Sequence, residues 1–149
     1  MCKKPILPPT YLLISIFLML ILFFIFPGVM LIPSPWNFLG LIPLGFGLWI
    51  NMIADRAFRK AKTTVKPFEE PAALITDGAF AICRHPMYLG FVAILIGVAL
   101  LFRALTPFLI VIIFAVLMDQ LFIRVEEGNL ESKFGQSWLE YKKKVRRWI

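Results

Sequence analysis

Charge is missing from the first third of the sequence. Residues 5–54 contain no Asp, Glu, Lys, Arg or His, although the chain of 149 residues has a net charge of +7. Hydrophobic residues make up 60% of the chain and the mean hydropathy is +0.82, whereas a soluble domain is about half apolar. The uncharged stretch is long enough for two membrane helices of about 20 residues each. The composition therefore favours an integral membrane protein.

Cysteine and histidine are also scarce. The two cysteines, Cys2 and Cys83, form no CxxC pair, and His85 is the only histidine. These absences disfavour a disulfide framework and a zinc site, so we predict no metal. A nucleotide-binding glycine loop is disfavoured as well, because no strand is predicted before the glycines of the second apolar run. We interpret these glycines as small residues that let helices approach closely: Gly40, Gly45 and Gly47.

Four apolar runs predict four membrane-spanning helices, since backbone groups in hydrocarbon must be hydrogen-bonded internally. The runs cover residues 10–30, 36–54, 86–102 and 104–123. No small-residue cleavage site follows the first run, which disfavours a signal peptide. The predicted fold is an all-α integral membrane bundle with a cytoplasmic amphipathic C-terminal helix. We divide it into an N-terminal transmembrane hairpin and a core that contains a cytosolic loop, a second hairpin and the C-terminal helix, residues 1–54 and 55–149.

The basic residues predict the orientation of the bundle. With four spans, every Lys and Arg except Arg103 falls on the same side of the membrane. Cytoplasmic loops carry the excess of Lys and Arg in membrane proteins, so both termini are predicted to be cytoplasmic. The positive charge then indicates attraction to an anionic lipid leaflet, and we predict no nucleic-acid partner.

Aromatic and apolar residues recur along the tail that follows the fourth run. Their spacing of three or four residues predicts one stripe on an amphipathic helix: Leu130, Phe134, Trp138, Tyr141, Val145 and Trp148. Such a helix could lie on the membrane surface with its aromatics buried. It could equally fold back and cap a pocket between the spans, and the sequence leaves both alternatives open.

A cluster of ionisable residues borders the third and fourth spans. Pro86 suits the first turn of a helix, which puts Arg84 and His85 at the N-terminal end of the third span, where free N–H groups favour an anion. Arg124 and Glu127 are three residues apart and share a helix face. An interfacial belt of polar residues and a local ion pair would explain these positions equally well.

Four motifs in residues 62–149 together resemble the isoprenylcysteine carboxyl methyltransferase family, which is related to the phospholipid methyltransferases. They are a Thr-x-Gly turn, an Arg-His-Pro-x-Tyr-x-Gly segment, a Glu-Glu pair and a Phe-Gly-x-x-Trp-x-x-Tyr segment, at residues 76–80, 84–90, 126–127 and 134–141. Two departures stand out. Ala79-Phe80 replaces the family's Pro-Tyr, and Trp138 stands where those methyltransferases more often have Tyr.

The resemblance implies an enzyme that transfers a methyl group from S-adenosylmethionine to a lipophilic acceptor in the membrane, such as the carboxylate of an isoprenylcysteine-like molecule. By the resemblance, residues 55–149 form the methyltransferase core. Its cofactor pocket is expected to involve six residues: Gly78, Phe80, His85, Tyr88, Leu89 and Glu127. Arg124 and Glu127 are the candidate catalytic residues, and Arg84 and Arg124 the candidates for binding an anionic acceptor. If the acceptor is an amine, His85 or Glu127 would be the general base.

Two other functions compete with methyl transfer. Sterol reductases that use NADPH share the Arg-His-Pro signature, but the pair Glu126-Glu127 and the short chain argue against a reductase. A small transporter or scaffold is the non-enzymatic alternative, yet a transporter should have ionisable groups near the bilayer midplane. The identity of the acceptor, the membrane that contains the protein and its oligomeric state stay open.

Overall fold

The computed structural model describes residues 7–26, 28–64, 68–69 and 71–148. It contains α1 (Pro8–Ile25), η1 (Trp36–Gly40), α2 (Leu41–Lys60), η2 (Gly78–Ala81), α3 (Pro86–Phe102), α4 (Thr106–Met118), the π-helical turn η3 (Asp119–Ile123), α5 (Arg124–Phe134) and α6 (Gln136–Lys144). Some predictions lie outside the described residues: those on Cys2, Lys3, Lys4 and Lys66.

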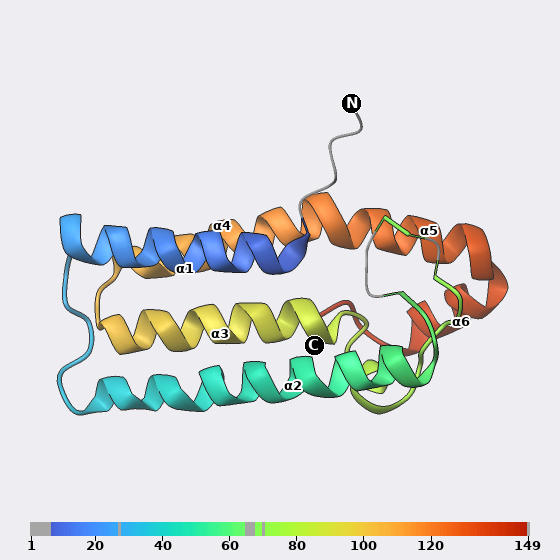
Figure 1. The fold of residues 1–149 in the computed structure, drawn as a ribbon, viewed down its shortest axis with the longest axis horizontal. Helices are drawn as coiled ribbons and strands as arrows, with labels where there is room; N and C mark the ends of the chain where they lie inside the picture. The colour runs from blue at the N-terminus through green and yellow to red at the C-terminus, as the bar shows by residue number, and fades with distance from the viewer. Residues whose placement is uncertain (1–6, 27, 65–67, 70, 149) are drawn as a thin grey trace.

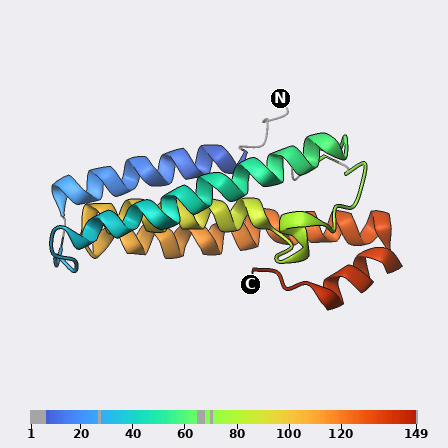
Figure 2. The ribbon, with the colours of Figure 1, turned by 90° about the horizontal axis from the view of Figure 1, so that it is seen from below.

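The four long helices lie alongside one another in one elongated bundle (Figure 1). α2 packs mainly on α3, and α1 packs mainly on α4. α4, η3 and α5 form one continuous rod that extends past the bundle, and α6 folds back beside it (Figure 2). The core between α1, α3 and α4 is made of aliphatic, Met and aromatic side chains. The prediction of an all-α membrane bundle is confirmed.

Within the described residues, three helical stretches are long and apolar enough to cross a membrane: Pro8–Ile25, Trp36–Lys60 and Thr106–Phe134. The third predicted span, α3, is shorter at 17 residues, which at a rise of about 1.5 Å per residue gives about 26 Å. That length is at the lower end of what crosses a bilayer. The first span ends earlier than predicted, at Ile25, because Phe26 leaves the helical conformation and the chain turns at Gly28 with φ +67°.

Two glycine pairs bring α3 into close contact with α2 and with the adjoining η1. A Cβ added to Gly47 would lie 2.5 Å from the carbonyl oxygen of Gly90, and one added to Gly40 would lie 2.5 Å from that of Gly97. No side chain larger than hydrogen fits at these positions without moving the helices apart. The interpretation of Gly40 and Gly47 as packing glycines is confirmed. Gly45 has no such role within the described part of the chain, because an added Cβ would have no neighbour within 4 Å.

The tail does not form the single amphipathic helix that the sequence predicted. Gly135 adopts φ +49°, which ends α5 and turns the chain into α6. Trp138, Tyr141 and Val145 then form a small buried cluster with Leu74 and other residues, while Trp148 packs against the main core. The tail therefore folds back against the bundle instead of presenting one stripe to the membrane surface.

The turn that follows α1 and the turn that follows α3 are joined by hydrogen bonds at one end of the bundle. Arg103, in the left-handed conformation with φ +64°, donates from Nε to the carbonyl of Ile32 at 2.9 Å, and Leu31 donates its N–H to the carbonyl of Arg103 at 2.8 Å. Thr106 Oγ1 donates to the carbonyl of Phe26 at 2.9 Å. These bonds join the 26–35 turn to the 103–106 turn, so both hairpins form one unit.

The glycine contacts predict that Gly47→Ala destabilises the protein, whereas Gly45→Ala does not. The new methyl group at position 47 would meet backbone atoms of α3, and overpacking of this kind costs about 1–3 kcal/mol. At position 45 the space is open, and alanine is the better helix former. Thermal unfolding in detergent measures the difference as a lower midpoint for Gly47→Ala alone. Equal midpoints for the two variants would contradict the close packing of α2 on α3.

Candidate active site

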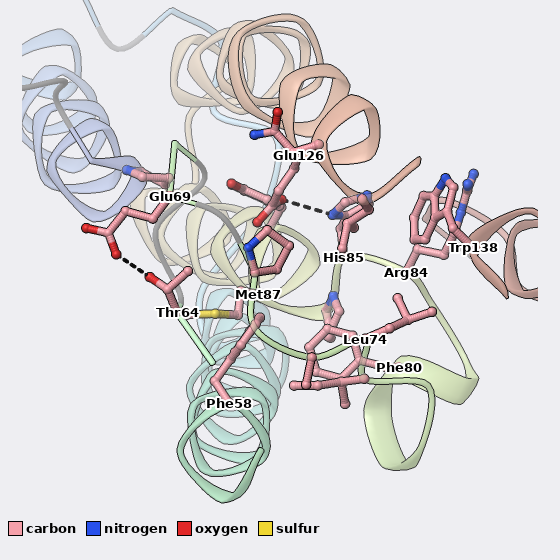
Figure 3. A pocket seen from close by; sticks show the side chains of 18 of the residues that line it. Phe58, Thr64, Glu69, Leu74, Phe80, Arg84, His85, Met87, Glu126 and Trp138 are labelled. Atoms are coloured by element: carbon pink, nitrogen blue, oxygen red, sulfur yellow. Dashed lines mark hydrogen bonds and ion pairs between the residues drawn. The ribbon is translucent and has the colours of Figure 1, made fainter. Parts of the chain in front are cut away.

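A cavity of about 240 Å³ lies at the end of the bundle where α2 ends and α3 begins. Its walls come from the start of α1, the end of α2, described residues between α2 and η2, η2 itself, the start of α3, α5 and α6. Apolar side chains of the membrane helices form one part, including Pro8, Phe58, Met87 and Phe91. In Figure 3, Thr64 and Glu69 lie on one side of the pocket and His85, Arg84 and Trp138 on the other.

The start of α3 positions the charged wall of this pocket. Pro86 occupies the first turn, and His85 is the N-cap residue, whose carbonyl accepts the N–H of Leu89 at 3.1 Å. The backbone N–H of Arg84 donates to the carbonyl of Arg146 at 3.0 Å, beside a parallel bridge between Cys83 and Arg146. The end of the chain therefore fixes the segment that leads into α3.

Glu127 is the centre of a buried charge cluster. Its Oε1 lies 3.3 Å from His85 Nε2 and 3.1 Å from Arg84 Nη1, and its Oε2 accepts from Arg147 Nη2 at 2.7 Å. Glu126 contacts the other ring nitrogen of the imidazole, with Oε2 3.3 Å from His85 Nδ1. The two adjacent carboxylates of α5 thus contact both ring nitrogens of the one histidine, and two arginines balance their charge.

Arg147 was not among the predicted site residues, yet its guanidinium joins two acidic groups. It donates from Nε and Nη2 to the two oxygens of Glu127, at 3.2 and 2.7 Å, and from Nη1 to Asp119 Oδ1 at 3.1 Å. Such a fork-like contact is the strongest form of an arginine–carboxylate pair. Arg147 belongs to a run of basic residues near the end of the chain, and nothing in the sequence distinguishes it from its neighbours. The spacing of residues along the sequence does not show that the tail returns to α5.

Arg124 lies elsewhere than its predicted role requires. Its side chain is 58% exposed, its Nε is 3.6 Å from Asp119 Oδ2, and it is not among the pocket-lining residues. Arg147 occupies the place beside Glu127 instead. The catalytic and acceptor-binding role of Arg124 stays a prediction, and the structure does not bring its side chain to the cavity. Of the two predicted acceptor-binding arginines, only Arg84 lines the pocket.

The six predicted cofactor residues divide into three groups. Phe80, His85 and Tyr88 line the cavity. Glu127 lies directly behind it, in contact with His85 and Arg84. Gly78 and Leu89 do not line it; Gly78 is exposed at a left-handed turn with φ +60° that leads the chain into η2.

Two aromatic residues of α6 complete the cover of the pocket. Trp138 is 1% exposed, and Tyr141 donates its hydroxyl to the carbonyl of Phe80 at 2.6 Å. Phe80 in turn packs edge-on against Phe58 of α2, with ring centroids 5.4 Å apart. Sequence reasoning placed Trp138 and Tyr141 on the amphipathic stripe, and the alternative in which the tail caps a pocket describes their position correctly.

Opposing effects act on the pKa of His85. Burial alone would lower it, because desolvation disfavours the imidazolium. The contacts with Glu126 and Glu127 and their negative charges outweigh burial and raise the pKa above its ordinary value. The two carboxylates therefore stabilise the protonated imidazole, which contacts one of them through each ring nitrogen.

The fold and the cavity define a class: a helical membrane protein with a small-molecule pocket whose walls are apolar on one side and charged on the other. The family described as phospholipid methyltransferase matches residues 36–137. The match covers more than half of the chain, and we conclude that the chain belongs to this family of S-adenosylmethionine-dependent membrane methyltransferases.

Individual relatives agree with this assignment. The chain is 39% identical over 75 residues to the protein-S-isoprenylcysteine O-methyltransferase of Schizosaccharomyces pombe, a match that covers 48% of this chain and 30% of that protein. It is 40% identical over 80 residues to the protein of the same name from Saccharomyces cerevisiae, covering 52% of this chain and 32% of that protein. An uncharacterized protein of Haemophilus influenzae is 44% identical over 63 residues, which cover 42% of this chain and 100% of the relative. The chain thus spans about a third of the two named enzymes, and no solved structure matches it.

The charge cluster predicts an elevated titration midpoint for His85. Because the chain contains one histidine, its imidazole signals in a histidine-labelled sample can be followed by NMR without assignment. We expect a midpoint above the ordinary value of about 6.5, and Glu126→Gln should lower it by removing one of the two paired charges. A midpoint at or below 6.5 in the folded wild-type protein would contradict the ion pairs described here.

Proposed function

We propose that this protein transfers a methyl group from S-adenosylmethionine to a lipophilic acceptor that reaches the pocket from the bilayer. The observation that carries the proposal is the position of the cavity. Most of its lining residues belong to the region matched by the methyltransferase family, and it lies between membrane-helix side chains and the cluster of Arg84, His85, Glu126 and Glu127. The family match favours methyl transfer over the NADPH-dependent reductase and over a transporter.

The residues of the pocket fit the cofactor. S-adenosylmethionine supplies an electrophilic methyl group on a sulfonium, and it carries a carboxylate, an ammonium and a flat adenine ring. Aromatic walls from Phe80, Tyr88, Trp138 and Tyr141 suit the ring. Charged side chains of both signs suit the amino-acid end. We propose that His85 and Tyr88 contact the cofactor and that Glu127 holds His85 and Arg84 in place.

The chain contributes alignment more than covalent chemistry to this reaction. Methyl transfer from a sulfonium is an in-line displacement, for which holding the two reactants in the correct geometry supplies most of the rate effect. The cover formed by Phe80, Trp138 and Tyr141 would keep water from the reacting groups. The apolar wall of α1, α2 and α3 would hold the hydrophobic part of the acceptor.

Within this function, we propose a carboxylate of an isoprenylcysteine-like molecule as the first acceptor to test. The support is the printed activity of two relatives, both of them protein-S-isoprenylcysteine O-methyltransferases. An amine acceptor would in addition need a base to remove its proton, and Glu126, which lines the cavity, is the candidate for that base.

We also propose that both termini are cytoplasmic, since all described Lys and Arg except Arg103 lie on the pocket side of the bundle.

Calorimetric titration of the detergent-purified protein with S-adenosylhomocysteine, with NADPH in parallel, tests the cofactor assignment. We expect saturable binding of S-adenosylhomocysteine alone. His85→Ala and Glu127→Gln should weaken this binding at least about tenfold, because each removes a partner of a buried charge-assisted contact worth about 1.5–3 kcal/mol. Lys143→Ala, at an exposed position of α6, is the control and should leave the affinity unchanged.

Binding of NADPH without S-adenosylhomocysteine would move the protein to the reductases. Unchanged affinity in both His85→Ala and Glu127→Gln would contradict the site assignment. Once binding is established, radiolabelled methyl transfer to an S-farnesylcysteine derivative or to phosphatidylethanolamine vesicles distinguishes a carboxylate acceptor from an amine.

A further inference from the structure

Asp119 is an acidic residue that takes no direct part in the proposed reaction. It lies in the π-helical turn η3, between α4 and α5 of the long rod (Figure 1), and its side chain is 20% exposed. Its Oδ1 accepts from Arg147 Nη1 at 3.1 Å, and its Oδ2 lies 3.6 Å from Arg124 Nε. The arginine that binds Asp119 is therefore the one that also binds Glu127, through Nε and Nη2.

The π-helical turn decides in which direction Asp119 and Glu127 point. In a regular α-helix each residue adds about 100° of rotation, so side chains eight positions apart would diverge by about 80°. In η3 the N–H of Arg124 donates to the carbonyl of Asp119, five residues earlier, and such a turn holds one residue more than an α-helical turn. Eight positions then correspond to about seven, which is about two full turns. Asp119 and Glu127 therefore share one face of the rod.

The guanidinium of Arg147 lies between these two carboxylates. Side chains of a helix lean toward its N-terminus, so the longer side chain of Glu127 reaches back toward Asp119. The side chain of Arg147 is 34% exposed, whereas that of Glu127 is 7% exposed. A long and partly exposed side chain loses conformational freedom when it is held in one geometry. The second carboxylate offsets this loss, because it binds the guanidinium from the other side.

The contacts continue from Arg147 to the wall of the pocket. Arg147 binds Oε2 of Glu127 at 2.7 Å, which leaves Oε1 directed at His85 Nε2, 3.3 Å away. His85 lines the cavity, whereas Asp119 lies behind this wall. A side chain that meets a ligand is held precisely only when the groups behind it are themselves fixed. Asp119 is the outermost group in this series of contacts.

We infer that Asp119 is a positioning residue for the methyl-donor site: it fixes Arg147, and Arg147 holds Glu127 against His85. The inference rests on the proposed function. It also gives a function to the π-helical turn, because a regular α-helix through residues 119–127 would point the two carboxylates in different directions.

Two substitutions at Asp119 separate its charge from its place in the fold. Asp119→Asn keeps the shape and removes the charge, whereas Asp119→Glu keeps the charge. Asp55→Asn is the matched control, since it makes the same chemical change in α2, where Asp55 pairs with Arg59 at 2.7 Å. Combining Asp119→Asn with Arg147→Gln tests whether Asp119 acts through Arg147.

Calorimetric titration with S-adenosylhomocysteine measures the effect, and thermal unfolding of each variant checks that it is folded. Asp119→Asn is expected to weaken binding about three- to tenfold, at most the size of one charge-assisted hydrogen bond. Asp119→Glu should weaken binding less than Asp119→Asn does, and Asp55→Asn should leave the affinity unchanged. Arg147→Gln should lose at least as much as Asp119→Asn, and in that background Asp119→Asn should add less than about a twofold loss.

Three results would overturn the inference while the proposed function stands. They are wild-type affinity in the folded Asp119→Asn variant, an equal loss from Asp119→Asn with and without Arg147→Gln, and an equal loss in Asp119→Asn and Asp119→Glu. Failure of the folded wild-type protein to bind S-adenosylhomocysteine would contradict the proposed function, and this inference would fall with it.

Discussion

The carboxylate of Glu127 joins three segments that are far apart in the chain. It contacts Arg84 and His85 at the start of α3 and Arg147 near the end of the chain, and it is itself on α5. A buried carboxylate is costly unless charged partners and hydrogen bonds surround it. The position of Glu127 therefore requires that the tail returns to the bundle and that the segment before α3 stays beside α5. The shape of the pocket follows from that requirement.

The membrane bundle supplies the rigid support for this cluster. Close contact between α2 and α3 at Gly47 and Gly90 fixes the start of α3 relative to the end of α2, where Phe58 meets Phe80. The π-helical turn η3 carries Asp119, which binds the same guanidinium that binds Glu127. The apolar and charged walls of the cavity thus come from one connected framework, and the proposed methyl transfer would need such a framework to hold its two reactants in a fixed geometry.

The membrane helices could be predicted from the sequence, because long apolar runs are typical of helices that cross a bilayer. The Arg-His-Pro segment and the Glu-Glu pair also predicted that His85 and Glu127 belong to one site, and the structure brings these two side chains into contact. The helical spacing of apolar residues gave a wrong prediction for the tail, where the chain changes direction. Gly135 reverses the tail, so the stripe through Trp148 is not one helix. Periodicity shows which residues share a face, but it does not show which segment returns to pair with a charge, and it therefore gave no indication that Arg147 contacts Glu127.

A double-mutant cycle between Glu127→Gln and Arg147→Gln tests the central claim most directly. The free energy of unfolding in detergent would be measured for the wild-type protein, the two single variants and the double variant. If the ion pair between Glu127 and Arg147 organises the pocket, the stability losses of the two single variants are not additive. We then expect a coupling energy of about 1 kcal/mol or more. Losses that add to within about 0.5 kcal/mol would mean that the two groups act independently, and Glu127 would not be the residue on which the site depends.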